Sequence, residues 1–401
     1  MKKSYLLIFI LQINLLMANT NYKGCLLFLD DFKNTSDLDL ALSYSPNILL
    51  RSWYRWGEPS SQKSYQKRKK NVTKLLLRGI KLGGGTSLSI VNQLDMQSPS
   101  FNLSWLTINL EGKVIKKKNY SYATISSPGF RTYLIEKLIQ QVKLGVSELH
   151  LGETAGKINF DNWTLAYFSD WIFKKYPNKS KLWWYQQFGN LGLKLISSKK
   201  ISRNDIRTLK KLQKNRLFLE WGIVNNWKGI NKNKEKSFLF YLYHRNLNLF
   251  IMELRHQLKL NKLSASIDVW GFADWILDLE NKPDAVITTP PDGRWGFNWD
   301  KDISFDLKKN KKRIKSILKK EIEKLSPTQV VLMIDHSKPF YEFAKLPDKR
   351  QVKVLNYFSN ISNELSINFV VRTYTHKKSQ LGDFTKNWLR KTCEIKKNEI
   401  N

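Results

Sequence analysis

The sequence predicts an α/β protein, a (β/α)8 TIM barrel with a helical insertion between strands four and five. Two observations predict this fold. Short apolar runs alternate with helical patterns along most of the 401 residues, and several runs are nearly continuous in Val, Ile and Leu. Such runs are typical of strands buried on both faces of a parallel sheet. Eight of them suit a barrel, and a doubly wound open sheet is the alternative.

The predicted strands and helices follow one another along the chain. The strands are expected at residues 47–53, 75–82, 103–110, 147–152, 263–270, 285–289, 329–335 and 368–374. Helical periodicity or a helix-capping Asp predicts helices at residues 129–144, 161–175, 306–325 and 348–365. The segment 176–261 is too long for a single connection between the fourth and fifth strands, so extra helices are expected there. The Gly-Gly-Gly-Thr segment at 83–86 is expected to form a turn after the second strand.

The composition is that of a globular, strongly basic protein. Hydrophobic residues make up 42% and charged residues 25%, which excludes a fibrous or wholly disordered chain. The net charge is +34. Of the 68 basic residues, 53 are Lys and only 15 are Arg, whereas the recognition of phosphates and bases favours Arg. No zinc-finger, RRM or bZIP pattern is present, so no nucleic-acid partner is predicted. We expect the lysines to form a solvated surface, with an anionic surface polymer as the alternative partner.

The first residues have the pattern of a secretory signal peptide. Lys2 and Lys3 precede an apolar run at 5–17, and Ala18 follows it as a small residue at a cleavage site. The run is too short to span a membrane, so no integral membrane segment is predicted. The sequence therefore predicts a signal peptide at 1–18, one barrel domain at 19–401, and a secreted or periplasmic protein. A buried N-terminal helix is the alternative.

The two cysteines and five histidines predict neither metal nor cofactor. Cys25 lacks the aliphatic residue that a lipoprotein cysteine has three positions upstream, where Tyr22 stands, so lipidation is not favoured. Cys25 and Cys393 could form a disulfide or stay free thiols. Two cysteines cannot form a four-thiolate zinc site, and the histidines show no H-E-x-x-H or comparable spacing.

Residues at the carboxyl ends of the predicted strands indicate a carbohydrate substrate. A TIM barrel carries its function at this end. Sugar rings stack on aromatic planes, while carboxylates and guanidinium groups bind hydroxyls. For any single Trp, core packing is the alternative. The predicted substrate-binding residues are Arg51, Trp53, Arg55, Trp56, Asp268, Trp270, Asp292, Arg294, Trp295, His336 and Tyr374.

Glu153 and Asp335 are the predicted catalytic pair. Each directly follows or ends an apolar strand, the fourth and the seventh, and the tips of these strands are expected to face each other across the barrel mouth. Glycoside hydrolysis commonly needs two carboxyl groups across the scissile bond. We assign Glu153 as general acid/base and Asp335 as nucleophile or stabilising carboxylate. The alternative for each is helix capping or pairing with an arginine, and Asp268 and Asp292 are the reserve carboxylates.

One segment resembles a known superfamily. Ser127-Pro128-Gly129-Phe130-Arg131-Thr132-Tyr133-Leu134 leads through a predicted helix to a strand that ends in Gly152-Glu153. The segment is similar to the glycoside-hydrolase-like TIM barrels, broadly the β-galactosidase and α-amylase-like superfamily. This resemblance implies Glu153 as the strand-four acid and Asp335 as its strand-seven counterpart. Two positions depart from the best-known retaining barrels, which have Asn where Gly152 stands and Glu where Asp335 stands. A non-catalytic barrel that binds carbohydrate or cell envelope is therefore the alternative function.

Overall fold

The computed structural model describes most of the chain between Leu26 and Ile395. The described residues are 26–29, 48–51, 70, 73–77, 81–117, 120–153, 158–198, 200–222, 237–270, 279–288, 307–335, 347–372 and 383–395. The predicted signal peptide and Cys25 lie outside these ranges, and so does the side chain of Cys393. The signal peptide, the export and the state of the two thiols therefore stay predictions.

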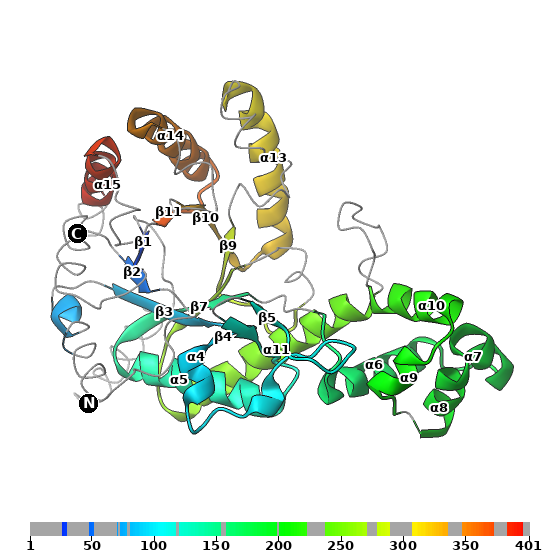
Figure 1. Ribbon diagram of the computed structural model, residues 1–401. Coiled ribbons are helices and arrows are strands. Elements are labelled where there is room, and N and C mark those ends of the chain that lie inside the picture. Colours follow the sequence, from blue (N-terminus) through cyan, green and yellow to red (C-terminus); the bar gives the residue numbers. More distant parts are fainter. Residues whose placement is uncertain are drawn as a thin grey trace, which may run out of the picture.

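Eight parallel strands form a closed barrel (Figure 1). They are β1 (Leu26–Leu29), β2 (Ile48–Arg51), β3 (Lys81–Ser87), β7 (Val146–Gly152), β8 (Ser266–Trp270), β9 (Ala285–Thr288), β10 (Gln329–Asp335) and β11 (Asn368–Arg372). Each strand pairs with the next barrel strand along the chain, and β11 closes the barrel on β1. The predicted α/β barrel is confirmed, and the open-sheet alternative is wrong.

Two of the eight predicted strands are wrong, and two barrel strands were not predicted. Residues 73–77 begin a helical turn in which Leu75 is buried and Leu77 is exposed, so this apolar run is not a strand. Residues 103–110 contain the short helix η2 (Leu103–Trp105) and isolated antiparallel bridges outside the barrel. The barrel strands that were not predicted are β1, whose four residues give a weak signal, and β3, which shares only residues 81–82 with a predicted strand. Two extra strands and two missing ones cancel, so β7 and β10 are indeed the fourth and seventh barrel strands.

The glycine run predicted as a turn lies within β3. The side-chain amide of Gln141 accepts a hydrogen bond from the Gly85 N–H at 2.7 Å and donates one to the Gly85 carbonyl at 3.0 Å. A Cβ atom at Gly84 would collide with this amide, and one at Gly85 would collide with the backbone of His150. Glycine is therefore needed here because a helix side chain and a neighbouring strand approach the β3 backbone closely.

Helices cover the outside of the barrel (Figure 1). They are α5 (Pro128–Lys143), α13 (Leu307–Leu325), α14 (Asp348–Glu364) and α15 (Asp383–Ile395). The bounds of α5, α13 and α14 differ by one residue from the predicted ones. Their apolar faces and the outward side chains of the strands, such as Leu149, Val269 and Leu332, form one large core.

The chain between β7 and β8 forms several helices with a second core. They are α6 (Asn162–Lys175), α7 (Lys181–Phe188), α8 (Asn190–Ser198), α9 (Arg203–Arg207), α10 (Lys211–Trp221) and α11 (Phe238–Leu260). Trp184, Trp221 and Phe168 are buried among them. Figure 1 shows α7 to α10 extending away from the barrel, while α11 reaches back to it. That residues 176–261 are an insertion into a single domain 19–401 stays a prediction, because these helices have a core of their own.

A small antiparallel sheet follows the carboxyl end of β3. It consists of β4 (Ile90–Asn92), β6 (Tyr120–Tyr122) and β5 (Lys116–Lys117), in that order. The helix α4 (Gln93–Gln97) begins after β4 with a capping box between Asn92 and Asp95. This excursion positions side chains beside the mouth of the barrel. Among the described residues, no helix is long and apolar enough to cross a membrane.

Candidate functional site at the carboxyl end of the barrel

The fourth barrel strand leads from a buried interior to an exposed carboxylate. Along β7, Leu149 and Leu151 face the outer helices, so the alternating residues Glu148 and His150 face the barrel interior. Glu153 follows directly after the strand and is exposed. The structure therefore places its carboxylate at the barrel end where TIM-barrel enzymes carry their active sites.

The backbone of Glu153 has a left-handed conformation that neighbouring residues hold in place. Its φ angle is 50°, which is uncommon for a residue other than glycine. The Ser89 hydroxyl donates a hydrogen bond of 2.8 Å to the Glu153 carbonyl, and the Leu88 N–H donates one of 2.9 Å to the Gly152 carbonyl. Such conformations persist where the surroundings over-determine them, and they cluster at functional sites.

Tyr122 of β6 lies within the electrostatic reach of Glu153. Burial raises the pKa of the Tyr122 phenol most. Its hydrogen bond to Tyr120 and the charges of Tyr120 and Glu153 raise that pKa further. Tyr122 thus stays a neutral hydroxyl beside the carboxylate. The sequence did not indicate this residue, because the strand that carries it belongs to the small sheet and not to the barrel.

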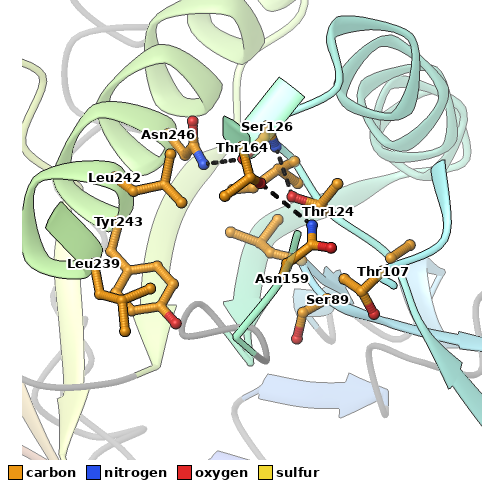
Figure 2. Close-up of a pocket in the computed structure, with 13 residues that line it drawn as sticks. Ser89, Thr107, Thr124, Ser126, Asn159, Thr164, Leu239, Leu242, Tyr243 and Asn246 are labelled. Atoms are coloured by element: carbon orange, nitrogen blue, oxygen red, sulfur yellow. Dashed lines mark hydrogen bonds between the residues drawn. The ribbon is translucent and has the colours of Figure 1, made fainter. Parts of the chain in front are cut away.

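A pocket adjoins the same segment (Figure 2). Its cavity volume is about 30 Å³, so it has room for about one water-sized group such as a hydroxyl. Figure 2 shows Tyr243 of α11 on one side and Ser89 and Thr107 on the other. The lining residues are Leu88, Ser89, Thr107, Ala123, Thr124, Ile125, Ser126, Asn159, Thr164, Leu239, Leu242, Tyr243 and Asn246.

Hydrogen bonds between distant segments hold the pocket wall. Asn246 of α11 donates to the Ser126 hydroxyl at 2.9 Å, and the Ile108 N–H donates to the Asn159 side-chain oxygen at 3.0 Å. The Asn159 amide also donates to Asp161, the N-cap of α6. The lining residues are hydroxyl, amide and apolar, and none is charged. This chemistry suits a hydroxyl group of a neutral ligand.

The other predicted site residues fall into three groups. Arg51, Trp270 and Asp335 are the last residues of β2, β8 and β10, so all three lie at the carboxyl end of the barrel, as predicted. Trp270 is half-buried against the apolar interior. The side chains of Arg51 and Asp335 lie outside what the structure describes, and between β7 and β10 stand β8 and β9. Outside the described residues altogether lie Trp53, Arg55, Trp56, Asp292, Arg294, Trp295, His336 and Tyr374.

Asp268 lies deeper in the barrel than its predicted place at the mouth. Its side chain is fully buried in the middle of β8, where Oδ2 lies 3.3 Å from Nε2 of His150. The Ser266 hydroxyl donates a hydrogen bond of 2.7 Å to Oδ1. Burial, and after it the charge of Asp284, raises the pKa of Asp268 well above its usual range.

Glu148 completes a buried cluster that the sequence analysis missed. One carboxylate oxygen of Glu148, one imidazole nitrogen of His150 and one carboxylate oxygen of Asp268 all lie within 4.8 Å of one another. Burial raises the pKa of Glu148 to about 8, although the charge of Lys81 lowers it somewhat. The available signal was the Glu-x-His spacing on a predicted strand, because alternate residues of a strand face the same side.

Three solved structures with a similar fold are β-galactosidases. The β-galactosidase of Rahnella sp. R3 is 12% identical with a TM-score of 0.59, over 94% of this chain and 56% of that one. The β-galactosidase of the haloarchaeon Halorubrum lacusprofundi is 9% identical with a TM-score of 0.56, over 92% and 57%. The β-galactosidase of Marinomonas ef1 is 11% identical with a TM-score of 0.54, over 92% and 59%.

These likenesses define the class of fold. The chain has a glycosidase-like TIM-barrel fold, which confirms the resemblance predicted from the sequence. It spans less than three-fifths of the length of each of these three structures. No family model matches the chain, and no curated protein matches it.

Proposed function

We propose that the protein is an exported glycoside hydrolase that cleaves O-glycosidic bonds in a poly- or oligosaccharide. The observation that carries the proposal is the exposed Glu153 at the end of the fourth strand, beside a small uncharged pocket that contains hydroxyl and amide groups. The glycosidase-like fold supports it but does not decide it, because barrels of one fold host many chemistries.

In this proposal Glu153 transfers the proton. As the bond between the sugar carbon and the leaving oxygen breaks, the Glu153 carboxyl protonates that oxygen. The resulting carboxylate then removes a proton from the attacking water if the enzyme retains configuration. Asp335 at the end of β10 acts as nucleophile in that case. In an inverting enzyme it acts as the base that activates water.

The surroundings of Glu153 have supporting roles. The hydrogen bond from Ser89 fixes the backbone from which the carboxylate projects, and Tyr122 supplies a neutral phenol near it. The hydroxyl and amide groups of the pocket bind one hydroxyl of the sugar. Predicted mouth residues such as Trp53, Trp56 and Arg294 complete the substrate cleft.

Sugar release by the purified full-length chain tests the proposal. Reducing ends are measured on a panel of poly- and oligosaccharides and of aryl glycosides. Glu153→Gln keeps the shape of the side chain but removes its proton transfer, so we expect an activity loss of roughly 10²–10⁴-fold. Glu111→Gln, at an exposed glutamate away from the barrel strands, is the matched control and keeps wild-type activity.

Two results would contradict the proposal. Equal activity of wild type and Glu153→Gln removes Glu153 from the chemistry. No sugar release by wild type, together with retained binding to a polysaccharide, would instead assign the barrel to non-catalytic carbohydrate or envelope binding. If binding to an anionic polymer falls steeply with salt, the lysine surface and not the pocket is responsible.

Export is tested separately from catalysis. Processing of residues 1–18 predicts a mature chain that begins directly after Ala18 when the protein is expressed with its signal peptide. Mass spectrometry of the secreted or periplasmic fraction measures that end. Recovery of the unprocessed chain in the cytoplasm alone would contradict export while leaving the catalytic proposal intact.

A further inference from the structure

The interior of the barrel contains three ionisable side chains from two neighbouring strands. Glu148 and His150 project from β7, and Asp268 projects from β8. Asp268 is the residue of β8 that pairs in register with His150. All three side chains are fully buried. The cluster lies below the mouth, since His150 is within β7 and Glu153 follows the end of this strand three residues later.

Glu148 has an unsatisfied carboxyl group. Neither of its side-chain oxygens has a hydrogen-bond partner in the part of the chain that the structure describes. A buried carboxylate without compensation is costly, because the interior replaces water with groups that do not solvate the charge. Buried polar atoms of this kind call for an explanation such as a bound ion.

We propose that Glu148, His150 and Asp268 bind one divalent transition-metal ion, with Zn²⁺ as the representative, inside the barrel. Imidazole nitrogen and carboxylate oxygen are both normal ligands of this ion. Two carboxylates and a neutral imidazole carry two negative charges, which a dication neutralises. The ion supplies the partner that the Glu148 oxygens lack.

The geometry of the His150–Asp268 pair supports the assignment. Zn²⁺ bonds of about 2.0–2.1 Å place tetrahedral ligand atoms about 3.3–3.4 Å apart. The distance between Nε2 of His150 and Oδ2 of Asp268 is 3.3 Å. The hydrogen bond that Ser266 donates to Oδ1 leaves Oδ2 turned toward His150, the kind of outer contact that orients metal ligands.

The competing explanation is that the cluster is compensated by protons. A neutral Glu148, consistent with its raised pKa, would remove the charge without any ion. The two explanations differ in a measurable way, since a metal ion competes with protons for the same atoms and binds more tightly as pH rises. A metal here ties β7 to β8 and takes no part in the proposed sugar chemistry.

Metal content and metal affinity of the untagged full-length chain test the proposal. The chain is stripped with a chelator, returned to Zn²⁺ at pH 8 and dialysed, and elemental analysis then counts the bound ion. We expect close to one zinc ion per chain and a thermal midpoint that rises with Zn²⁺ but not with Mg²⁺. Glu148→Gln and Asp268→Asn should each weaken binding by about 100-fold or more, since removal of a ligand costs more than the 10–100-fold typical of outer contacts.

The control separates a metal ligand from any buried acid. Glu220 is buried in the second core, where it contacts Lys175 and Arg216, and Glu220→Gln should leave zinc binding unchanged. Equal zinc content of wild type and Glu148→Gln overturns the proposal, and so does a wild type without bound zinc.

A second measurement uses only wild type, in case the variants do not fold. Co²⁺ added to the stripped chain should produce visible absorption bands, and X-ray absorption should show nitrogen and oxygen ligands including one imidazole. A spectrum of free aqueous Co²⁺ overturns the proposal. Since no sugar is involved, the metal site and the glycosidase proposal can fail independently.

Discussion

Two groups of neighbouring strands line the described barrel interior with different chemistry, and we call them the apolar half and the charged half. On the side of β9, β10 and β11 the inward side chains are apolar and buried, namely Ala285, Ile287, Val331, Met333 and Val370. On the side of β7 and β8 the fully buried inward side chains are Glu148, His150 and Asp268, and Trp270 at the end of β8 is half-buried. The first half is the packed interior that an eight-stranded barrel needs. The second half requires an ion or protons, so packing alone does not account for it.

A charge placed in the apolar half has the largest expected effect. Val331→Asp puts a carboxylate where the described surroundings are apolar, and we expect it to destabilise the protein by more than about 4 kcal/mol or to prevent folding. Urea denaturation measures the effect. Leu212→Asp, at a residue that is 84% exposed, should change stability by about 0.5 kcal/mol or less. Val331→Asp at near wild-type stability would refute a packed apolar half.

A cavity in the apolar half has the next largest effect. Met333 is fully buried, so Met333→Ala should cost about 2–5 kcal/mol through lost contacts and the cavity left behind. The comparison variant is Met252→Ala, at a residue that is 43% exposed, which should cost clearly less. Equal losses in the two variants, measured by chemical denaturation, would show that burial in the barrel does not set the cost.

The charged half should make stability depend on pH in the metal-free protein. The pKa of Glu148 rises from 4.5 to about 8 on folding, so between these values the folded state binds more protons than the unfolded state. The contribution of Glu148 to the free energy of unfolding is therefore complete below pH 4.5 and is lost as pH rises toward 8. We expect a loss of about 2 kcal/mol between pH 6 and pH 8, which Glu148→Gln abolishes.

Denaturation series with a chelator at several pH values measure this dependence. The exposed Glu111→Gln variant should keep the wild-type slope. Addition of Zn²⁺ at pH 8 should restore the lost stability in wild type and not in Glu148→Gln. A wild-type slope that Glu148→Gln leaves unchanged would assign the pH dependence to other groups.

The smallest expected effect concerns the orientation of Asp268. Ser266→Ala removes the hydrogen bond to Oδ1 and should cost about 1 kcal/mol. It should also weaken zinc binding by roughly 10–100-fold, since outer contacts orient metal ligands. Ser197→Ala, which removes an exposed hydroxyl from α8, should change neither quantity. Stability is followed by urea denaturation and affinity by titration with Zn²⁺, and unchanged zinc affinity in Ser266→Ala would contradict the orienting role.

Part of the candidate site could be predicted because it depends on local order along the chain. An apolar strand that ends in Gly152-Glu153 places a carboxylate at the barrel mouth without knowledge of any distant residue. The pocket could not be predicted in this way. Its wall joins Ser89 after β3, Asn159 before α6 and Asn246 in α11, and only packing brings these segments together.

The sequence by itself determined the α/β alternation, three of the outer helices to within one residue at each end, and the strand that leads to Glu153. These features follow from local periodicity, which each segment carries alone. Only the tertiary structure decided that the glycines at 83–85 form part of a strand, because this strand lies in close contact with Gln141 and with the β7 backbone. It also decided that no strand begins at Leu75. The tertiary structure also decided that Asp268 meets Glu148 and His150, since β7 pairs with β8 although a long helical segment separates them in the sequence.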